Sequence, residues 1–132
     1  MMDEGTHTVR GFMRSMLPVH EELGELVRRL YKRPQVKLAT TYEPQPYPSC
    51  DLGVSAELKH GAVVDFWVDV ESTDAGWTVS PSVERHDPDE DGSHTEVDLG
   101  QRLVSSAAAL PTTLVGVLRE LREAVGNDTL FR

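Results

Sequence analysis

Apolar residues recur at steps of three and four from residue 9 to residue 31, which is the period of an amphipathic helix. Pro18 interrupts this stripe, so it predicts either a kink or a second segment that begins at Pro18, where a missing N–H costs little. A later stripe that includes Leu114, Leu118 and Leu121 predicts a helix that opens near residue 106 or 111 and runs to about residue 125. Each helix therefore has one apolar face to bury.

Between the two helical stripes the period of the apolar residues changes to two, which is the period of a strand. Four stretches alternate in this way: residues 36–42, 52–58, 64–70 and 77–84. In the first of them, the alternation places Val36, Leu38, Thr40 and Tyr42 on one face. A fifth, less regular strand is indicated by Val97, Leu99 and Leu103. Turn residues at His60-Gly61 and in the segment "STDAG" separate neighbouring strands, which predicts antiparallel hairpins.

This order of elements predicts one α+β domain over residues 1–132. We expect two layers: a four- to five-stranded antiparallel meander sheet, with the N-terminal and C-terminal helices packed on one face because both apolar stripes need cover. A chain of this length buries a substantial core without disulfides or a structural metal. The other face of the sheet, which reads as polar, is expected to stay open.

The formal net charge is -9, and it is concentrated in the middle of the chain. Residues 51–100 contain 13 acidic residues against Lys59 and Arg85, whereas the flanks are close to balanced. Nucleic acids and anionic membranes attract positive surfaces, so this balance argues against both as partners. No apolar run reaches the length of a membrane span, and the N-terminus "MMDEGTHTVR" has acidic residues where a signal peptide has bases. A single cysteine, Cys50, favours a reducing, cytoplasmic setting.

The acidic segment 86–94, "HDPDEDGSH", has two interpretations. The stretch "DPDEDGSHTEVD" resembles the calcium loop of the EF-hand family, and this resemblance implies a weak calcium site with the ligands Asp87, Asp89, Asp91, Ser93 and Asp98. It departs from that family because its last position is aspartate instead of glutamate, and because the residues before it alternate like a strand. A hairpin tip is the favoured interpretation, since proline, aspartate and glycine are common turn residues.

His86 and His94 offer a further alternative, because they would meet across such a hairpin as ligands for zinc or nickel. No cysteine accompanies them, so we predict no metal and no cofactor for the fold. The chain also lacks a phosphate-binding glycine loop and a recognisable catalytic triad, so we expect a protein that is not an enzyme. Asp65 and Asp69 would share one strand face and are a weak candidate for an acid/base pair.

Trp67 is the residue that the pattern singles out as a binding residue. It lies on the polar side of the third strand between Asp65 and Asp69, shares that side with Glu71, and has Glu57 and Glu84 as candidate cross-strand neighbours. An aromatic side chain ringed by charge of one sign is typical of an interaction hot spot. The alternative is that the indole only lies flat over small neighbours such as Ser55 or Ser80 and shields the sheet.

These observations favour a small acidic protein-binding module that engages a basic protein partner through its exposed sheet face. In type it resembles the acidic immunity proteins that neutralise basic nuclease toxins, and the small acidic chaperones or adaptors of secretion systems. It departs from the secretion chaperones at "STDAG", where they have a helix. A monomer and a homodimer are both compatible with this reading. The competing class is a ligand-binding or enzymatic domain with a pocket between helices and sheet, entered near Tyr47 and Cys50.

Overall fold

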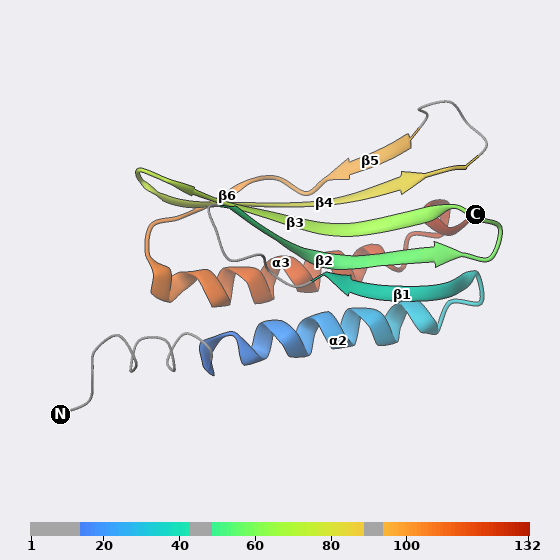
Figure 1. The fold of residues 1–132 in the computed structure, drawn as a ribbon, viewed down its shortest axis with the longest axis horizontal. Helices are drawn as coiled ribbons and strands as arrows, with labels where there is room; N and C mark the ends of the chain where they lie inside the picture. The colour runs from blue at the N-terminus through green and yellow to red at the C-terminus, as the bar shows by residue number, and fades with distance from the viewer. Residues whose placement is uncertain (1–13, 43–48, 89–93) are drawn as a thin grey trace.

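The computed structural model of the chain describes residues 14–42, 49–88 and 94–132. Within this part, an antiparallel sheet is covered on one face by two α-helices, as Figure 1 shows. The elements follow one another as α2 (Leu17–Tyr31), β1 (Val36–Tyr42), β2 (Ser49–Leu58), β3 (Val63–Thr73), β4 (Gly76–His86), β5 (His94–Asp98), β6 (Arg102–Val104) and α3 (Leu110–Ala124). The predicted two-layer α+β fold is confirmed.

The helices begin where the sequence predicts them. Pro18 lies in the first turn of α2, where its missing N–H breaks no hydrogen bond of the helix. A short 3-10 turn at Ala107–Ala109 precedes α3. Ser106 is the N-cap of this 3-10 turn, and its side chain accepts a hydrogen bond from the N–H of Ala109. The α3 stripe predicted from the sequence is buried against the sheet and α2.

The five strands β1 to β5 lie side by side in chain order, each antiparallel to the next. The predicted meander is therefore correct, but the fifth strand is divided. Its two parts, β5 and β6, both pair with β4, and the chain leaves the ladder between them near Pro81, which cannot donate a backbone hydrogen bond. The division changes which side chains face the core: Val104 is buried, whereas Leu103 is 68% exposed on the other face.

The face assignment that alternation predicts for β1 is wrong at its start. The register against β2 shifts between Val36 and Leu38, so one extra residue is accommodated there. Val36 is buried in the core, whereas Leu38 lies on the opposite face with 49% of its surface exposed. Because side chains alternate strictly along a strand, a single inserted residue moves everything after it to the other face.

A side chain from α2 forms hydrogen bonds with the free edge of β1. The hydroxyl of Tyr31 donates to the carbonyl oxygen of Ala39 at 3.4 Å and accepts from the N–H of Ala39 at 3.0 Å. An unpaired edge strand is a template for unwanted pairing with another chain, and a side chain that satisfies its backbone groups removes part of that template. Tyr31 thus joins the helical layer to the edge of the sheet.

The C-terminal segment is held by two arginines. Asp128–Phe131 forms a short 3-10 turn, and Phe131 is fully buried, with its ring stacked on Phe66 at 6.3 Å between centroids. The guanidinium of Arg33 lies 4.3 Å from the Phe131 ring centroid and donates to Asp128 Oδ1 at 2.8 Å. Arg85 donates to the carbonyl oxygen of Leu130 at 2.9 Å. The end of the chain is therefore part of the core.

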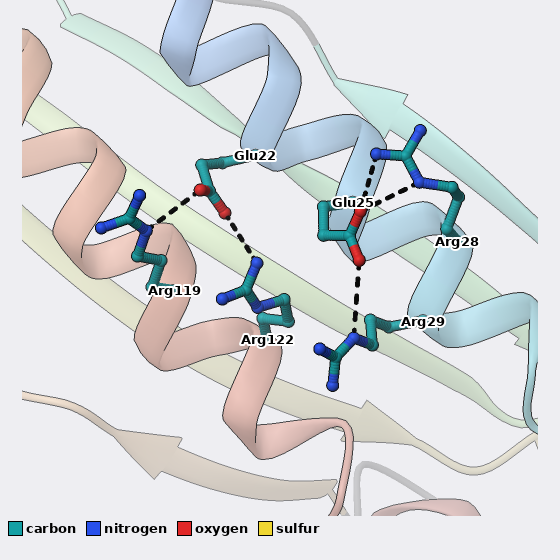
Figure 2. A network of polar contacts seen from close by, with 6 residues as sticks. All are labelled: Glu22, Glu25, Arg28, Arg29, Arg119 and Arg122. Carbon is teal, nitrogen blue, oxygen red and sulfur yellow. Dashed lines mark hydrogen bonds and ion pairs between the residues drawn. The ribbon is translucent and has the colours of Figure 1, made fainter.

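Ion pairs connect the outer sides of the two helices, as Figure 2 shows. Glu22 of α2 accepts from Arg119 at 3.0 Å and from Arg122 at 3.2 Å, both on α3. Within α2, Glu25 pairs with Arg28 and Arg29. These arginines belong to the helical layer, and glutamates beside them offset their charge.

Candidate functional site

The candidate site is the sheet face on which none of the described helices lies, and we call it the open face. Both helices lie on the other side of the sheet in Figure 1, and the alternate residues that point toward them are buried and apolar. Cross-strand register places the acidic residues of the open face as follows: Asp51 and Glu57 on β2, Asp65, Asp69 and Glu71 on β3, Glu84 on β4, and Glu96 and Asp98 on β5. All six residues predicted to bind a partner lie on this face.

Trp67 occupies the middle of the open face, on the central strand β3. Its cross-strand neighbours are Gly53 on β2 and Ser82 on β4, so the positions on both sides of it carry no side chain or a small one. Position 53 admits no side chain at all, because a Cβ there would lie 2.0 Å from the carbonyl oxygen of Phe66. Trp67 is half-buried. A large aromatic side chain therefore stands among small neighbours, with part of its surface accessible to solvent.

On one side of Trp67 the open face carries three carboxylates that lie close together. Asp51 is the direct cross-strand partner of Asp69, and Glu71 follows on the same face of β3. Partial burial, a side-chain hydrogen bond with Asp69, and the negative charges of Asp69 and Glu71 raise the pKa of Asp51 to about 6. In the part of the chain that the structure describes, no basic side chain forms an ion pair with any of the three. This end of the face therefore carries negative charge that no ion pair among the described side chains offsets.

The perturbed carboxyl makes stability depend on pH. Because the pKa of Asp51 is raised in the folded protein, from 3.8 to about 6, the folded state keeps a proton in this window that the unfolded chain has released. Stability therefore falls as the pH rises through the window, and stays lower above it. We expect Asp51→Asn to raise the free energy of unfolding at pH 7.5 by roughly 1 kcal/mol, after allowance for screening by solvent. Urea denaturation of both proteins measures this difference.

The gain should shrink toward pH 4, where Asp51 of the parent protein is itself neutral. Asp74→Asn is the matched control, because Asp74 is exposed in the turn between β3 and β4 and the same charge is removed away from the pair. It should change stability by less than about 0.5 kcal/mol. A gain for Asp51→Asn that is equal at pH 4 and pH 7.5 would contradict the electrostatic origin.

On the other side of Trp67 the acidic residues have a basic partner of their own. His86 Nε2 lies 3.2 Å from Glu84 Oε2 and 3.6 Å from Asp65 Oδ2. Lys37 lies 3.6 Å from Glu57 near the edge of the sheet. The negative potential of the open face is therefore less compensated at the end that carries Asp51 and Asp69.

The acidic segment joins two paired strands. β4 ends at His86 and β5 begins at His94, and these two residues are register partners. Strands thus stand on both sides of the segment where an EF-hand has helices. Of the predicted calcium ligands, Asp89, Asp91 and Ser93 lie outside the described residues, so the calcium site stays a prediction.

The two predicted calcium ligands that the structure describes, Asp87 and Asp98, accept hydrogen bonds from nearby residues. Asp87 accepts from Arg85, and this hydrogen bond lowers its pKa. Asp98 accepts from the N–H of Gly100 at 2.8 Å. Where the structure describes the side chains, no group of three or more histidine, cysteine, aspartate or glutamate residues is arranged to hold a metal ion.

The space between sheet and helices has the character of a core. Among the described residues, no polar or charged side chain is buried there, and the buried residues are apolar. Convergent polar groups are what a ligand pocket needs. The predicted pocket entrance is near Tyr47 and Cys50, whose side chains lie outside the described part of the structure.

Several residues of the open face were not predicted from the alternation pattern: Asp51, Glu96, Asp98, Leu38 and Leu103. For Asp51 a signal was present, because counting outward from the turn at His60-Gly61 pairs Asp51 with Asp69. The exposure of Leu38 and Leu103 had no such signal, since it follows from the bulge in β1 and the division between β5 and β6.

Comparisons with known proteins add no further guide to function. The chain matches no protein-family model, no curated protein and no solved structure. In the described residues, none of the helices has the length and apolar character that crossing a membrane requires.

Proposed function

We propose that this protein is a small, non-enzymatic binding module that engages a basic protein partner through the open face of its sheet. Trp67 supplies the central contact, and the carboxylates around it attract the partner and orient it. The single cysteine supports a reducing, cytoplasmic setting for this function. The module would act as an immunity-type inhibitor or as a chaperone or adaptor, as a monomer or a homodimer.

The position of Trp67 is the observation that carries this proposal. A half-buried tryptophan stands on the central strand of an uncovered sheet face, with Asp65 and Asp69 two positions away on either side. Tryptophan is enriched at the centres of interfaces, where it contributes a large share of the binding free energy once neighbouring contacts exclude water. Carboxylates around such a centre mainly raise the rate and specificity of association with a positive surface.

The three carboxylates beside Trp67 that form no ion pair among the described residues support the same proposal. The fold keeps Asp51, Asp69 and Glu71 together although partial burial, a hydrogen bond with Asp69 and the negative charges of Asp69 and Glu71 raise the pKa of Asp51. Natural proteins often retain such unfavourable groups where function requires them. A partner that carries arginine or lysine would relieve this repulsion on binding, so part of the binding energy would come from the strain in the free protein.

We expect Trp67→Ala to weaken partner binding at least ~30-fold, equivalent to about 2 kcal/mol, because it removes the anchor of the interface. The melting temperature should change little, since the side chain is only half-buried and lies outside the core between sheet and helices. The measurement uses a partner that is captured from the host by the tagged protein, identified by mass spectrometry and purified. Its affinity for both proteins is then measured at low and high salt.

Leu17→Ala is the matched control. Leu17 is an exposed apolar residue of α2, 57% accessible, and it belongs to the helical layer instead of the open face. Binding should be unaffected by this change. The proposal would be wrong if the captured partner were acidic, if its binding did not weaken with salt, or if Trp67→Ala bound it as well as the parent protein does.

A further inference from the structure

Two aspartates of the open face, Asp51 on β2 and Asp69 on β3, lie directly across from each other. We propose that these aspartates share one proton in the free protein, and that a cationic side chain of the basic partner replaces this proton on docking. The proton passes to the solvent, so docking is coupled to pH and weakens in acid. This inference rests on the proposed function and names the regulation of its site.

The first argument is the geometry of the pair. Asp51 and Asp69 are register partners, and the Cβ atoms of such partners lie about 4.5–5.5 Å apart on one face of an antiparallel sheet. Two carboxylates at this separation repel each other when both are ionised, and one proton between them removes the repulsion. Partial burial, the side-chain hydrogen bond between the two aspartates, and the charges of Asp69 and Glu71 raise the pKa of Asp51 to about 6.

The second argument is the set of groups around the pair. On β4, the residues across from Asp69 and Glu71 are Ser80 and Thr78, which carry no charge. On the other side, β1 pairs with β2 only as far as the residue two positions beyond Asp51. The sheet itself separates the pair from both helices. Among the described residues, the charged groups that face Asp51 are therefore Asp69 and Glu71, and both are acidic.

The third argument is a second pair of carboxylates on the same face. Asp65 and Glu84 are register partners on β3 and β4, and His86 Nε2 lies 3.6 Å from Asp65 Oδ2 and 3.2 Å from Glu84 Oε2. One nitrogen group of the chain thus lies near both carboxylates of that pair. Asp51 and Asp69 have the same cross-strand arrangement, so one lysine ammonium or arginine guanidinium of the partner can contact both of them.

The effect on affinity follows from the two states of the pair. A cation beside the carboxylates stabilises their ionised form, so the pKa of Asp51 in the complex should return toward its ordinary value of 3.8. Between this value and about 6, the complex binds fewer protons than the free protein, and affinity therefore increases as the pH rises through this window. Two such pKa values make binding about 10-fold tighter at pH 7.5 than at pH 5.

A synthetic lysine–glycine repeat peptide tests the inference in place of the partner. Calorimetric titration at low ionic strength gives its affinity for the protein at pH 5 and at pH 7.5. The same titration at pH 6, in two buffers with different heats of ionisation, gives the number of protons released. We expect binding to be at least ~10-fold tighter at pH 7.5, and the pair to release ~0.5 proton per peptide at pH 6.

Two variants assign the proton to the pair. Asp51→Asn and Asp69→Asn should each reduce the pH dependence of the affinity to ~3-fold or less, because the remaining carboxylates are largely ionised at pH 5. Affinity should be lost mainly at pH 7.5, and most of the proton release at pH 6 should disappear. Asp74→Asn is the control: it removes the same charge from the turn between β3 and β4 and should keep the full pH dependence.

NMR of the carboxyl carbons gives a readout that is independent of affinity. In the free protein, the signals of Asp51 and Asp69 should titrate together, with a step near pH 6 that belongs to the pair. In the presence of saturating peptide, this step should move to lower pH.

The outcomes separate this inference from the proposed function. If the parent protein and both variants of the pair showed the same pH dependence, or if proton release persisted in both variants, the shared proton would be rejected and the acidic docking face would stand. If the peptide did not bind in a salt-dependent way at pH 7.5, the docking face and the shared proton would both be rejected.

Discussion

Phe131→Ala is expected to lower the free energy of unfolding by about 4 kcal/mol, which is a large part of the stability of a domain of this size. Phe131 is fully buried, and it stacks on Phe66 near the centre of the sheet. Its removal leaves a cavity between β3 and the C-terminal segment. The change also removes the ring on which Arg33 rests, so a half-buried cation loses part of its packing.

Urea denaturation followed by fluorescence and by circular dichroism measures this loss. Phe131→Leu is the first control: it keeps most of the buried volume and should cost about 1.5 kcal/mol. Thr129→Ala, an exposed change in the same short turn, should cost less than about 0.5 kcal/mol. If Phe131→Ala lost no more than Thr129→Ala, the C-terminal segment would not be part of the folded core.

Gly53→Ala is expected to cost 3 kcal/mol or more by the same measurement, roughly the scale of severe overpacking, or to prevent folding. The added Cβ would lie 2.0 Å from the carbonyl oxygen of Phe66 and 3.1 Å from the Cα of Trp67. Both atoms belong to the backbone of β3, which cannot rotate away as a side chain does. The central strands would have to separate beside Trp67, so the binding site and the core would be damaged together.

Gly100→Ala distinguishes this steric effect from an ordinary loss of glycine. Gly100 has a positive φ of 88°, and a Cβ there has no neighbour within 4 Å. Its replacement should therefore cost only about 1 kcal/mol, the strain of a left-handed conformation. Equal losses at positions 53 and 100 would show that β2 and β3 approach less closely at Gly53 than described.

The fold was predictable from the sequence because both helices and the strands around β3 have a clear period and clear ends. Pro18 marks the start of α2, and the two tight turns at residues 59–62 and 74–75 set the hairpins on both sides of β3. In such hairpins the register follows from the turn, and alternation then assigns each residue to a face. Trp67 and the acidic residues predicted with it lie on the predicted face for this reason, but the residues directly across from Trp67 are Gly53 and Ser82, and the candidate neighbours Glu57 and Glu84 pair with Val63 and Asp65.

The prediction failed where the strands are irregular. Alternation assumes an unbroken ladder, so it put Leu38 on the same face as Val36 and missed the exposure of Leu103. A bulge and a strand break depend on how β1, β4 and their neighbours pack, and neither leaves a local signature strong enough to read. The raised pKa of Asp51 was likewise missed, because it depends on the distance between groups of two strands.

The sequence by itself determined the two layers, the order of the elements and the separation of an apolar side from an acidic side of the sheet, because these depend on local periodicity and on the need to bury apolar surface. Only the tertiary structure decided that Gly53 and Ser82 are the cross-strand partners of Trp67, and that Asp51 and Asp69 meet without a basic partner among the described residues. These features depend on cross-strand distances and close backbone contacts, which arise only when distant segments pack together.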